Sequence, residues 1–457
     1  MIMTKMILAG AAIAVLVLGG SQLVSQTTAV VTVASDPGVR CADIGAGGPI
    51  GGLTGSQAAF FEAGQEDFLE AEGVSDGLGP RFNLDGCAGC HSQPAVGGTS
   101  PAPFLTPGPG CTPAPNPQVA MATFMGANNT VPSFIKADGP VREARFKFNP
   151  DGTRDGGVHG LFVISGRSDA PGCNISQENF ASQVAQNNVI FRIPTPTFGL
   201  GLIEQVPDRA ILANQAANAS AKSALGIGGH PNRNGNDGTI TKFGWKAQNK
   251  SLLLFSGEAY NVEMGISNEL FQSERDETPS CQFVKLPNDV TDTTAGTGVA
   301  TVSAIEKFAF FMRFLAPPRP SSNTPGGPSS INNGSQLFST IGCALCHTPT
   351  LQTGDSTVAA LRNKPVDLFS DLLVHNMGTG LGDNVIQGAA GPNEFRTAPL
   401  WGLGQRVFFL HDGRTSDLLT AILAHRSPGS EANLVINNFR ALGESSKQDV
   451  VNFLRSL

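Results

Sequence analysis

Cys87-Ala88-Gly89-Cys90-His91 and Cys343-Ala344-Leu345-Cys346-His347 are two copies of the motif C-x-x-C-H, and each copy follows a glycine. In this motif the two thiols add to the two vinyl groups of a haem, and the histidine becomes the proximal ligand of the iron. The alternative is a redox or zinc C-x-x-C site with a chance histidine beside it, and it weakens when the whole pattern occurs twice. The sequence therefore predicts two covalently bound haem c groups, with both histidines as metal ligands.

The composition excludes one class of partner. A chain of 457 residues is long enough for two or three domains. Its net charge of −7 and its charged fraction of 15% argue against binding to nucleic acid. The 55 glycines and 31 prolines fit short helices that are joined by long ordered loops.

The N-terminus has the pattern of an export signal. Lys5 precedes an uncharged apolar run over residues 6–18, and small residues follow it. We therefore predict a signal peptide over residues 1–34 and a periplasmic protein. The alternative is an uncleaved anchor, the one case in which we expect contact with a membrane. Export agrees with the two motifs, because haem c is attached outside the cytoplasm.

Four cysteines lie outside the motifs, namely Cys41, Cys111, Cys173 and Cys281. An even number in an exported protein predicts two disulfides. Four cysteines allow three pairings, and the sequence does not choose among them.

An internal repeat sets the predicted domains. Residues 191–201 after the first motif resemble residues 395–404 after the second. We predict a mainly α protein of two tandem cytochrome c domains, over residues 35–315 and 331–457, joined by a linker at 316–330. The first domain is expected to contain loop and β-hairpin insertions, with residues 158–165 as a hairpin strand.

Three helices are predicted from apolar spacing. The first contains Ile305, Phe308, Met312 and Leu315, and the second covers residues 334–341 before the second motif. The third ends the chain. In it Ser445 and Gln448 form a capping box, and the buried side chains are Val450, Leu454 and Leu457.

Longer motifs resemble a known family. From about Gly55 to Leu457 the chain is similar to the di-haem oxidoreductase family and, more distantly, to bacterial di-haem cytochrome c peroxidases and MauG-type enzymes. The motifs that carry the resemblance are residues 77–83, 334–338, 371–378, 395–401 and 410–414.

The resemblance implies a reaction and two catalytic residues. Peroxide would be reduced at the N-terminal haem, with electrons arriving through the C-terminal haem and Trp245 between the haems. Glu263 matches the acid/base position, and its carboxylate suits proton transfer between the two peroxide oxygens. Trp401 is the alternative relay. Phe255 stands near the position where the peroxidases have a glutamine, which is a departure from the family pattern.

The sixth ligand of the C-terminal haem is Met in the peroxidases and Tyr in MauG-type enzymes. Met377 is the sole methionine after the second motif, whereas the one tyrosine, Tyr260, lies in the other half. We therefore predict Met377 as a metal ligand, with His375 as the competitor. A thioether ligand would raise the potential of this haem and make it the electron-accepting one. The sequence does not assign a sixth ligand to the first haem.

The remaining site predictions concern propionates and calcium. His411 and Arg414 are expected to hold haem propionates, since Arg matches a carboxylate, and His425 is expected to be structural. Residues 232–238 faintly resemble a calcium loop, although an Asx-Gly turn is the simpler interpretation. The expected partners are a small electron-donor protein, either a cytochrome c or a cupredoxin, and peroxide or another small oxidant. The alternatives are a non-catalytic electron carrier and a MauG-like oxidation of a protein or organic substrate.

Overall fold

The computed structural model describes residues 33–42, 45–323 and 325–457. The predicted export signal, residues 1–34, lies outside the described residues except for its last two. In the described part of the chain, no helix has the length and apolar character needed to cross a membrane.

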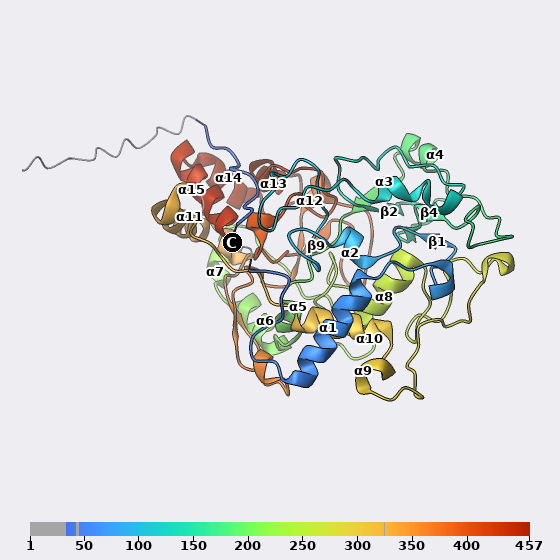
Figure 1. The fold of residues 1–457 in the computed structure, drawn as a ribbon. Coiled ribbons are helices and arrows are strands. Elements are labelled where there is room, and N and C mark those ends of the chain that lie inside the picture. The colour runs from blue at the N-terminus through green and yellow to red at the C-terminus, as the bar shows by residue number, and fades with distance from the viewer. Residues whose placement is uncertain (1–32, 43–44, 324) are drawn as a thin grey trace, which may run out of the picture.

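The fold is mainly α, with short strands between the helices (Figure 1). The α-helices are α1 (Gly55–Leu69), α2 (Cys87–Cys90), α3 (Gln118–Met121), α4 (Phe180–Ala185), α5 (Leu200–Glu204), α6 (Asp208–Ala216), α7 (Ala219–Ala224), α8 (Leu252–Met264), α9 (Gly298–Thr301), α10 (Ala304–Phe314), α11 (Gly327–Thr340), α12 (Gly378–Leu381), α13 (Leu418–Ala424), α14 (Asn433–Ala441) and α15 (Glu444–Ser456). The strands are β1 (Arg81–Phe82), β2 (Glu143–Phe146), β3 (Val158–His159), β4 (Phe162–Val163), β5 (Val189–Arg192), β6 (Leu351–Gln352), β7 (Pro365–Val366), β8 (Val374–Asn376) and β9 (Glu394–Arg396). Short 3₁₀ turns include η4 (Cys343–Leu345) and η6 (Leu403–Gln405).

The helix that precedes the first motif crosses a helix from the end of the same half. Helix α1 packs on α10 (Figure 1), and the rings of Phe61 and Phe311 lie 5.3 Å apart in the contact. Gly64 lets the two backbones meet, because a Cβ there would lie 2.1 Å from the carbonyl oxygen of Lys307. The predicted helix over residues 305–315 is confirmed as α10, with its apolar residues buried.

The helix that precedes the second motif is crossed in the same way by the last helix of the described chain. Helix α11 packs on α15, with the rings of Phe338 and Phe453 5.4 Å apart. A Cβ on Gly334 would lie 2.0 Å from the carbonyl oxygen of Asp449. Helix α11 begins at Gly327, within the predicted linker, because a glycine in the left-handed region and a proline start it earlier than the apolar pattern suggests.

The internal repeat of the sequence is also a structural repeat. Gly199 and Gly402 both adopt left-handed conformations, with φ of 68° and 71°. Two residues later, Gly201 and Gly404 lie so close to the end of a helix that a Cβ would reach the carbonyl oxygen of Arg313 in α10 or of Arg455 in α15. Each Gly-Leu-Gly segment therefore fixes the last helix of its own half.

The C-terminal helix is held by the beginning of the described chain, as Figure 1 shows at the red helices. The fully buried guanidinium of Arg455 pairs with Asp36 at 2.6 Å. Gln448 exchanges hydrogen bonds with the backbone of Ser35. The predicted capping box is therefore wrong: Gly443 is the N-cap, and Gln448 serves the N-terminal segment instead. The predicted burial of Val450, Leu454 and Leu457 is confirmed.

Residues from beyond the predicted linker also pack into the core of the first half. The largest apolar core joins residues 61–315 with Leu351, Leu361, Leu368, Leu372 and Trp401 from beyond the second motif. A second core lies around α11, α13, α14 and α15. The predicted domain bounds thus follow chain order, whereas the packing combines segments from both sides of 316–330.

The predicted hairpin strand at residues 158–165 is two strands in different sheets. Strand β3 pairs with β2 in the sheet of order β3-β2-β5, and β4 pairs with β1. All pairings are antiparallel, and a break at Gly160 separates the strands. A Cβ on Gly160 would lie 2.8 Å from the Cβ of Arg81, so the bend allows β1 to approach.

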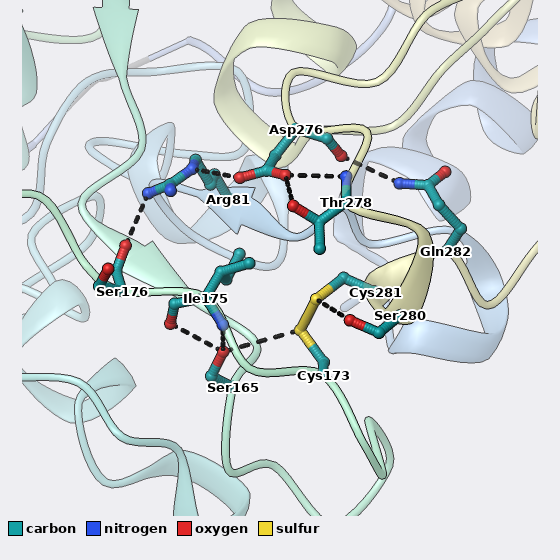
Figure 2. Close-up of a disulfide and its surroundings, with 10 residues drawn as sticks. All are labelled: Arg81, Ser165, Cys173, Ile175, Ser176, Asp276, Thr278, Ser280, Cys281 and Gln282. Carbon is teal, nitrogen blue, oxygen red and sulfur yellow. Dashed lines mark hydrogen bonds and ion pairs between the residues drawn. A yellow bond between two sulfur atoms is a disulfide. The ribbon is translucent and has the colours of Figure 1, made fainter.

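Two disulfides connect long loops of the first half. They are Cys41–Cys111 and Cys173–Cys281, one of the three pairings that the sequence allowed. Around Cys173–Cys281, Ser165 bonds the backbone of Ile175, and Arg81 pairs with Asp276 at 2.8 Å (Figure 2). Such cross-links reduce the entropy of the unfolded chain.

Candidate functional site

The two motifs open onto two large cavities. The first holds about 1180 Å³ and is lined by Cys87, Cys90 and His91, and the second holds about 1370 Å³ and is lined by Cys343, Cys346 and His347. All four cysteines are free thiols, as thioether formation requires.

The two histidines are oriented alike. The Nδ1 of His91 lies 2.9 Å from the carbonyl oxygen of Gly98, and that of His347 lies 3.0 Å from the carbonyl oxygen of Phe369. A ring that donates from Nδ1 presents an unprotonated Nε2 to a metal. Removal from water lowers the pKa of each to about 4, so both rings are neutral at pH 7. Both sites fit an iron-bound haem.

Trp245 separates the two cavities and lines both of them. Its Nε1 donates to the carbonyl oxygen of Ile193 at 2.9 Å, and its own carbonyl accepts from the backbone of Arg396 at 2.8 Å. Residue 245 is thus hydrogen-bonded to one residue from each half, through its indole to Ile193 and through its backbone to Arg396. Trp401, the alternative relay, is buried in the first core and does not line either cavity.

Glu263 lies in the first cavity, near the end of α8. Its Oε2 accepts from Nδ2 of the buried Asn83 at 3.0 Å. Loss of water, together with the neighbouring carboxylate of Glu143, raises the pKa of Glu263 well above its usual range. Both effects favour the protonated form of this side chain. Phe255 lines the same cavity and stacks with Phe243, 6.2 Å between ring centroids.

Glu143 is a site residue that sequence reasoning missed. It lies on β2, lines the first cavity and is hydrogen-bonded to Glu263. Burial opposes its ionisation, but Arg145, at 2.7 Å, holds the pKa of Glu143 below its ordinary value. The opposite directions of the two pKa shifts favour one shared proton, placed toward Glu263. The sequence carries no signal for this pair, because strand β2 and helix α8 are far apart in the chain.

A family model described as "Di-haem oxidoreductase, putative peroxidase" matches residues 142–457. The chain belongs to the di-haem oxidoreductase family. It is therefore an oxidoreductase that carries haem. The resemblance stated from the sequence motifs is confirmed at this level.

Two solved structures are distantly similar to this di-haem oxidoreductase. A MauG-like protein associated with microbial copper homeostasis aligns at 16% identity and a TM-score of 0.29, over 58% of this chain and 90% of that one. Hydrazine synthase from Kuenenia stuttgartiensis aligns at 16% identity and a TM-score of 0.24, over 35% of this chain and 56% of that one. The second alignment thus spans little more than half of the hydrazine synthase chain. A comparison with curated protein sequences gave no match.

The sixth position of the second haem has two candidates in the di-haem oxidoreductase. Met377 lines the second cavity, as predicted for a ligand. His375 also lines it, but its Nε2 lies 3.0 Å from Asp371 and its Nδ1 lies 2.7 Å from Glu431. Because both ring nitrogens of His375 face carboxylates, neither is available to iron.

His425 is the second candidate, although the sequence suggested a structural role. It follows α13 and lines the second cavity, and its Nδ1 lies 2.8 Å from the carbonyl oxygen of Ala421. Burial lowers the pKa of His425. The ring therefore repeats the orientation of His91 and His347, with Nε2 left for a metal.

Of the two residues predicted to hold propionates, only His411 lines the second cavity. His411 is buried, lines the second cavity and stacks on Phe395 at 4.2 Å. Arg414 is exposed, pairs with Asp412 at 2.7 Å and does not line that cavity. Two other guanidinium groups line it, those of Arg396 and Arg406, and burial lowers the pKa of each to about 10. Two buried cations side by side favour an anionic ligand such as a propionate.

In the predicted calcium loop, side-chain oxygens already accept hydrogen bonds or form ion pairs with nearby residues. Asp237 accepts from Thr239 and pairs with Lys250, and Asn234 accepts from the backbone of Asn236. These are the bonds of Asx turns. Near this loop the buried Lys246 donates to two backbone carbonyls of the second half and pairs with Asp383 at 2.9 Å. Calcium binding stays a prediction.

Proposed function

We propose that the protein is a periplasmic di-haem peroxidase with covalently attached haem c groups. Electrons from a small cytochrome c or cupredoxin enter at the C-terminal haem, pass Trp245 and reduce peroxide at the N-terminal haem. The observation that supports this best is the position of Glu263: its carboxyl group lines the first cavity beside Glu143 and accepts a hydrogen bond from Asn83. A site that only carries electrons has no use for a buried acid that can release a proton.

The direction of electron flow rests on the difference between the cavities. The first contains the Glu143–Glu263 pair, and Asn83 donates a hydrogen bond to Glu263. In the second cavity Met377 and His425 face the space, and either could close the sixth position of the iron. A closed position suits electron transfer, whereas an open position suits peroxide. Trp245 is the side chain that lines both cavities.

The residues of the first cavity have separate tasks. Haem, once bound, supplies the electron exchange and a binding position for peroxide. Glu263 holds a proton that it can deliver to the leaving peroxide oxygen. Asn83 fixes the orientation of that carboxyl group, and Arg145 keeps Glu143 ionised, so that the proton stays on Glu263. Phe255 keeps water away from part of the wall.

The test combines spectroscopy with turnover. In the half-reduced protein, one high-spin and one low-spin haem support an enzyme, and rapid peroxide consumption with a reduced donor supports a peroxidase. Two low-spin haems and no turnover with any donor would leave the electron carrier. Oxidation of a protein or organic substrate without a donor would favour the MauG-like alternative.

Attachment and export need their own measurements. The mass of the denatured mature protein should include two haems, when the host can mature cytochromes c. The same mass gives the first residue of the mature chain. A mass without haem would contradict the covalent assignment, and an intact residue 1 would contradict cleavage.

A further inference from the structure

Tyr260 and Glu72 form a buried pair beside the first cavity. The phenol oxygen of Tyr260 donates to Oε1 of Glu72 at 2.7 Å. Tyr260 is 5% exposed and Glu72 is 8% exposed. Tyr260 is also the one tyrosine of the 457-residue chain. A buried phenol bonded to a buried carboxylate is costly unless the contact is used, since neutral packing would serve the core as well.

The pair lies next to the haem attachment. Tyr260 lines the first cavity together with Cys87, and its ring packs edge-on against Phe308 at 5.1 Å. Helix α8 carries both Tyr260 and Glu263, so the phenol and the acid are one turn apart on a single rigid element. Glu72 lies after α1, and its backbone N–H donates to Asp85.

The chemistry of a phenol explains why the partner matters. Loss of an electron makes the phenol O–H strongly acidic, and the oxidation is easy only when a base takes the proton at once. The carboxylate of Glu72 is hydrogen-bonded to that proton. A proton that moves along an existing hydrogen bond needs no reorganisation of the site.

We propose that Tyr260 and Glu72 are a redox-active pair that supplies one electron to the N-terminal haem after peroxide has oxidised it. The electron leaves the phenol and the proton moves from the Tyr260 oxygen to Glu72, which leaves a neutral tyrosyl radical and a carboxylic acid. This inference rests on the proposed peroxidase function, because peroxide is the oxidant. The pair is a reserve when no electron arrives past Trp245.

The charges around the pair predict its pH dependence. Burial raises the pKa of Glu72 to about 7, and the acidic groups Glu70, Asp76 and Asp67 add to the shift. Burial and Glu72 together raise the pKa of Tyr260 well above its usual range, with Asp289 acting in the same direction. Glu72 can accept the proton only when it is ionised. The radical yield should therefore rise as pH increases through about 7.

The experiment uses the mature protein with both haems oxidised and tyrosine deuterated on the ring. It is mixed with peroxide, frozen within milliseconds and measured by electron paramagnetic resonance. We expect a radical signal that narrows on deuteration, disappears in Tyr260→Phe and falls about tenfold or more in Glu72→Gln. Glu66→Gln is the matched control, an exposed acidic residue of α1 outside the pair that should keep the signal.

The outcomes separate this inference from the proposed function. A haem spectrum that changes with peroxide without any tyrosine signal overturns the inference and leaves the peroxidase standing. A haem spectrum that does not change contradicts the peroxidase. In that event a photogenerated ruthenium polypyridyl oxidant tests the pair directly. A yield that is equal in wild type and Glu72→Gln overturns the pairing, provided that the haem spectra show both variants to be folded.

Discussion

The carboxyl groups of Glu143 and Glu263 are hydrogen-bonded to each other at the wall of the first cavity. Arg145 holds Glu143 ionised, and Asn83 donates to Glu263. Two carboxyl groups in contact cannot both ionise at low cost, so the pair keeps one proton at neutral pH. The first two predictions concern this proton.

Replacement of the acid should remove turnover without removing the haems. In Glu263→Gln the amide keeps the size of the side chain but cannot release a proton to peroxide. Peroxide consumption with a reduced donor should fall about 10²–10⁴-fold, the usual contribution of an acid–base group. Glu178→Gln, in the same half but outside the cavity, should retain activity. Full turnover in Glu263→Gln would clear this residue of the role.

Replacement of its partner should shift the pH profile. Burial and the charge of Glu143 raise the pKa of Glu263. In Glu143→Gln that charge is lost and Arg145 is released, so Glu263 should ionise at a lower pH. If activity depends on protonated Glu263, the alkaline limb of the pH profile should then move to lower pH. The measurement is turnover against pH, and an unmoved alkaline limb would mean that Glu143 does not control the proton.

The two candidate ligands of the second haem can be told apart by paired variants. We expect His425→Ala to convert a low-spin haem to high-spin, because the ring of His425 is oriented as the two motif histidines are. Met377→Ala should then have the smaller effect. A loss of potential at one haem in Met377→Ala, with unchanged spectra in His425→Ala, would restore the thioether predicted from the sequence.

Trp245→Phe should slow electron transfer between the haems and leave both potentials nearly unchanged. The reason is that Trp245 lines both cavities without being in a position to bind either iron through its indole. Stopped-flow reduction of the first haem through the second measures this step. Trp401→Phe is the control, and an equal slowing in both variants would point to packing.

Gly334→Ala should be strongly destabilising. The added Cβ would lie 2.0 Å from the carbonyl oxygen of Asp449, so α11 and α15 would have to separate. Overpacking of this kind costs about 1–3 kcal/mol, occasionally more. Gly55→Ala is matched to it, since nothing lies within 4 Å of a Cβ at that position. Denaturant unfolding compares them, and equal midpoints would contradict the close crossing.

The sequence was informative where chemistry fixes the spacing. The motifs, the apolar stripe of α10 and the family resemblance all depend on residues that are near one another in the chain. The structure confirms the stripe and the family model confirms the resemblance, whereas covalent haem attachment stays a prediction. Residues 158–165 show the limit. Their alternation predicts strands, but the partners β1 and β2 come from elsewhere in the chain.

The site residues show the same limit. Glu143, His425 and Arg406 reach their cavities through tertiary packing that leaves no local pattern. His375 lies two residues from Met377 and looked like a competitor for iron. Its two carboxylate partners, Asp371 and Glu431, become visible only in three dimensions.

The contact between Asp36 and Arg455 has a consequence for the order of assembly. The residues at its two ends are among the first and the last of the described chain to be synthesised. The contact therefore closes only after both C-x-x-C-H motifs have been made. A product that stops before α15 leaves Asp36 unpaired and the apolar faces of α11 and η6 uncovered. Quality-control proteases would be able to distinguish such a product from the finished molecule.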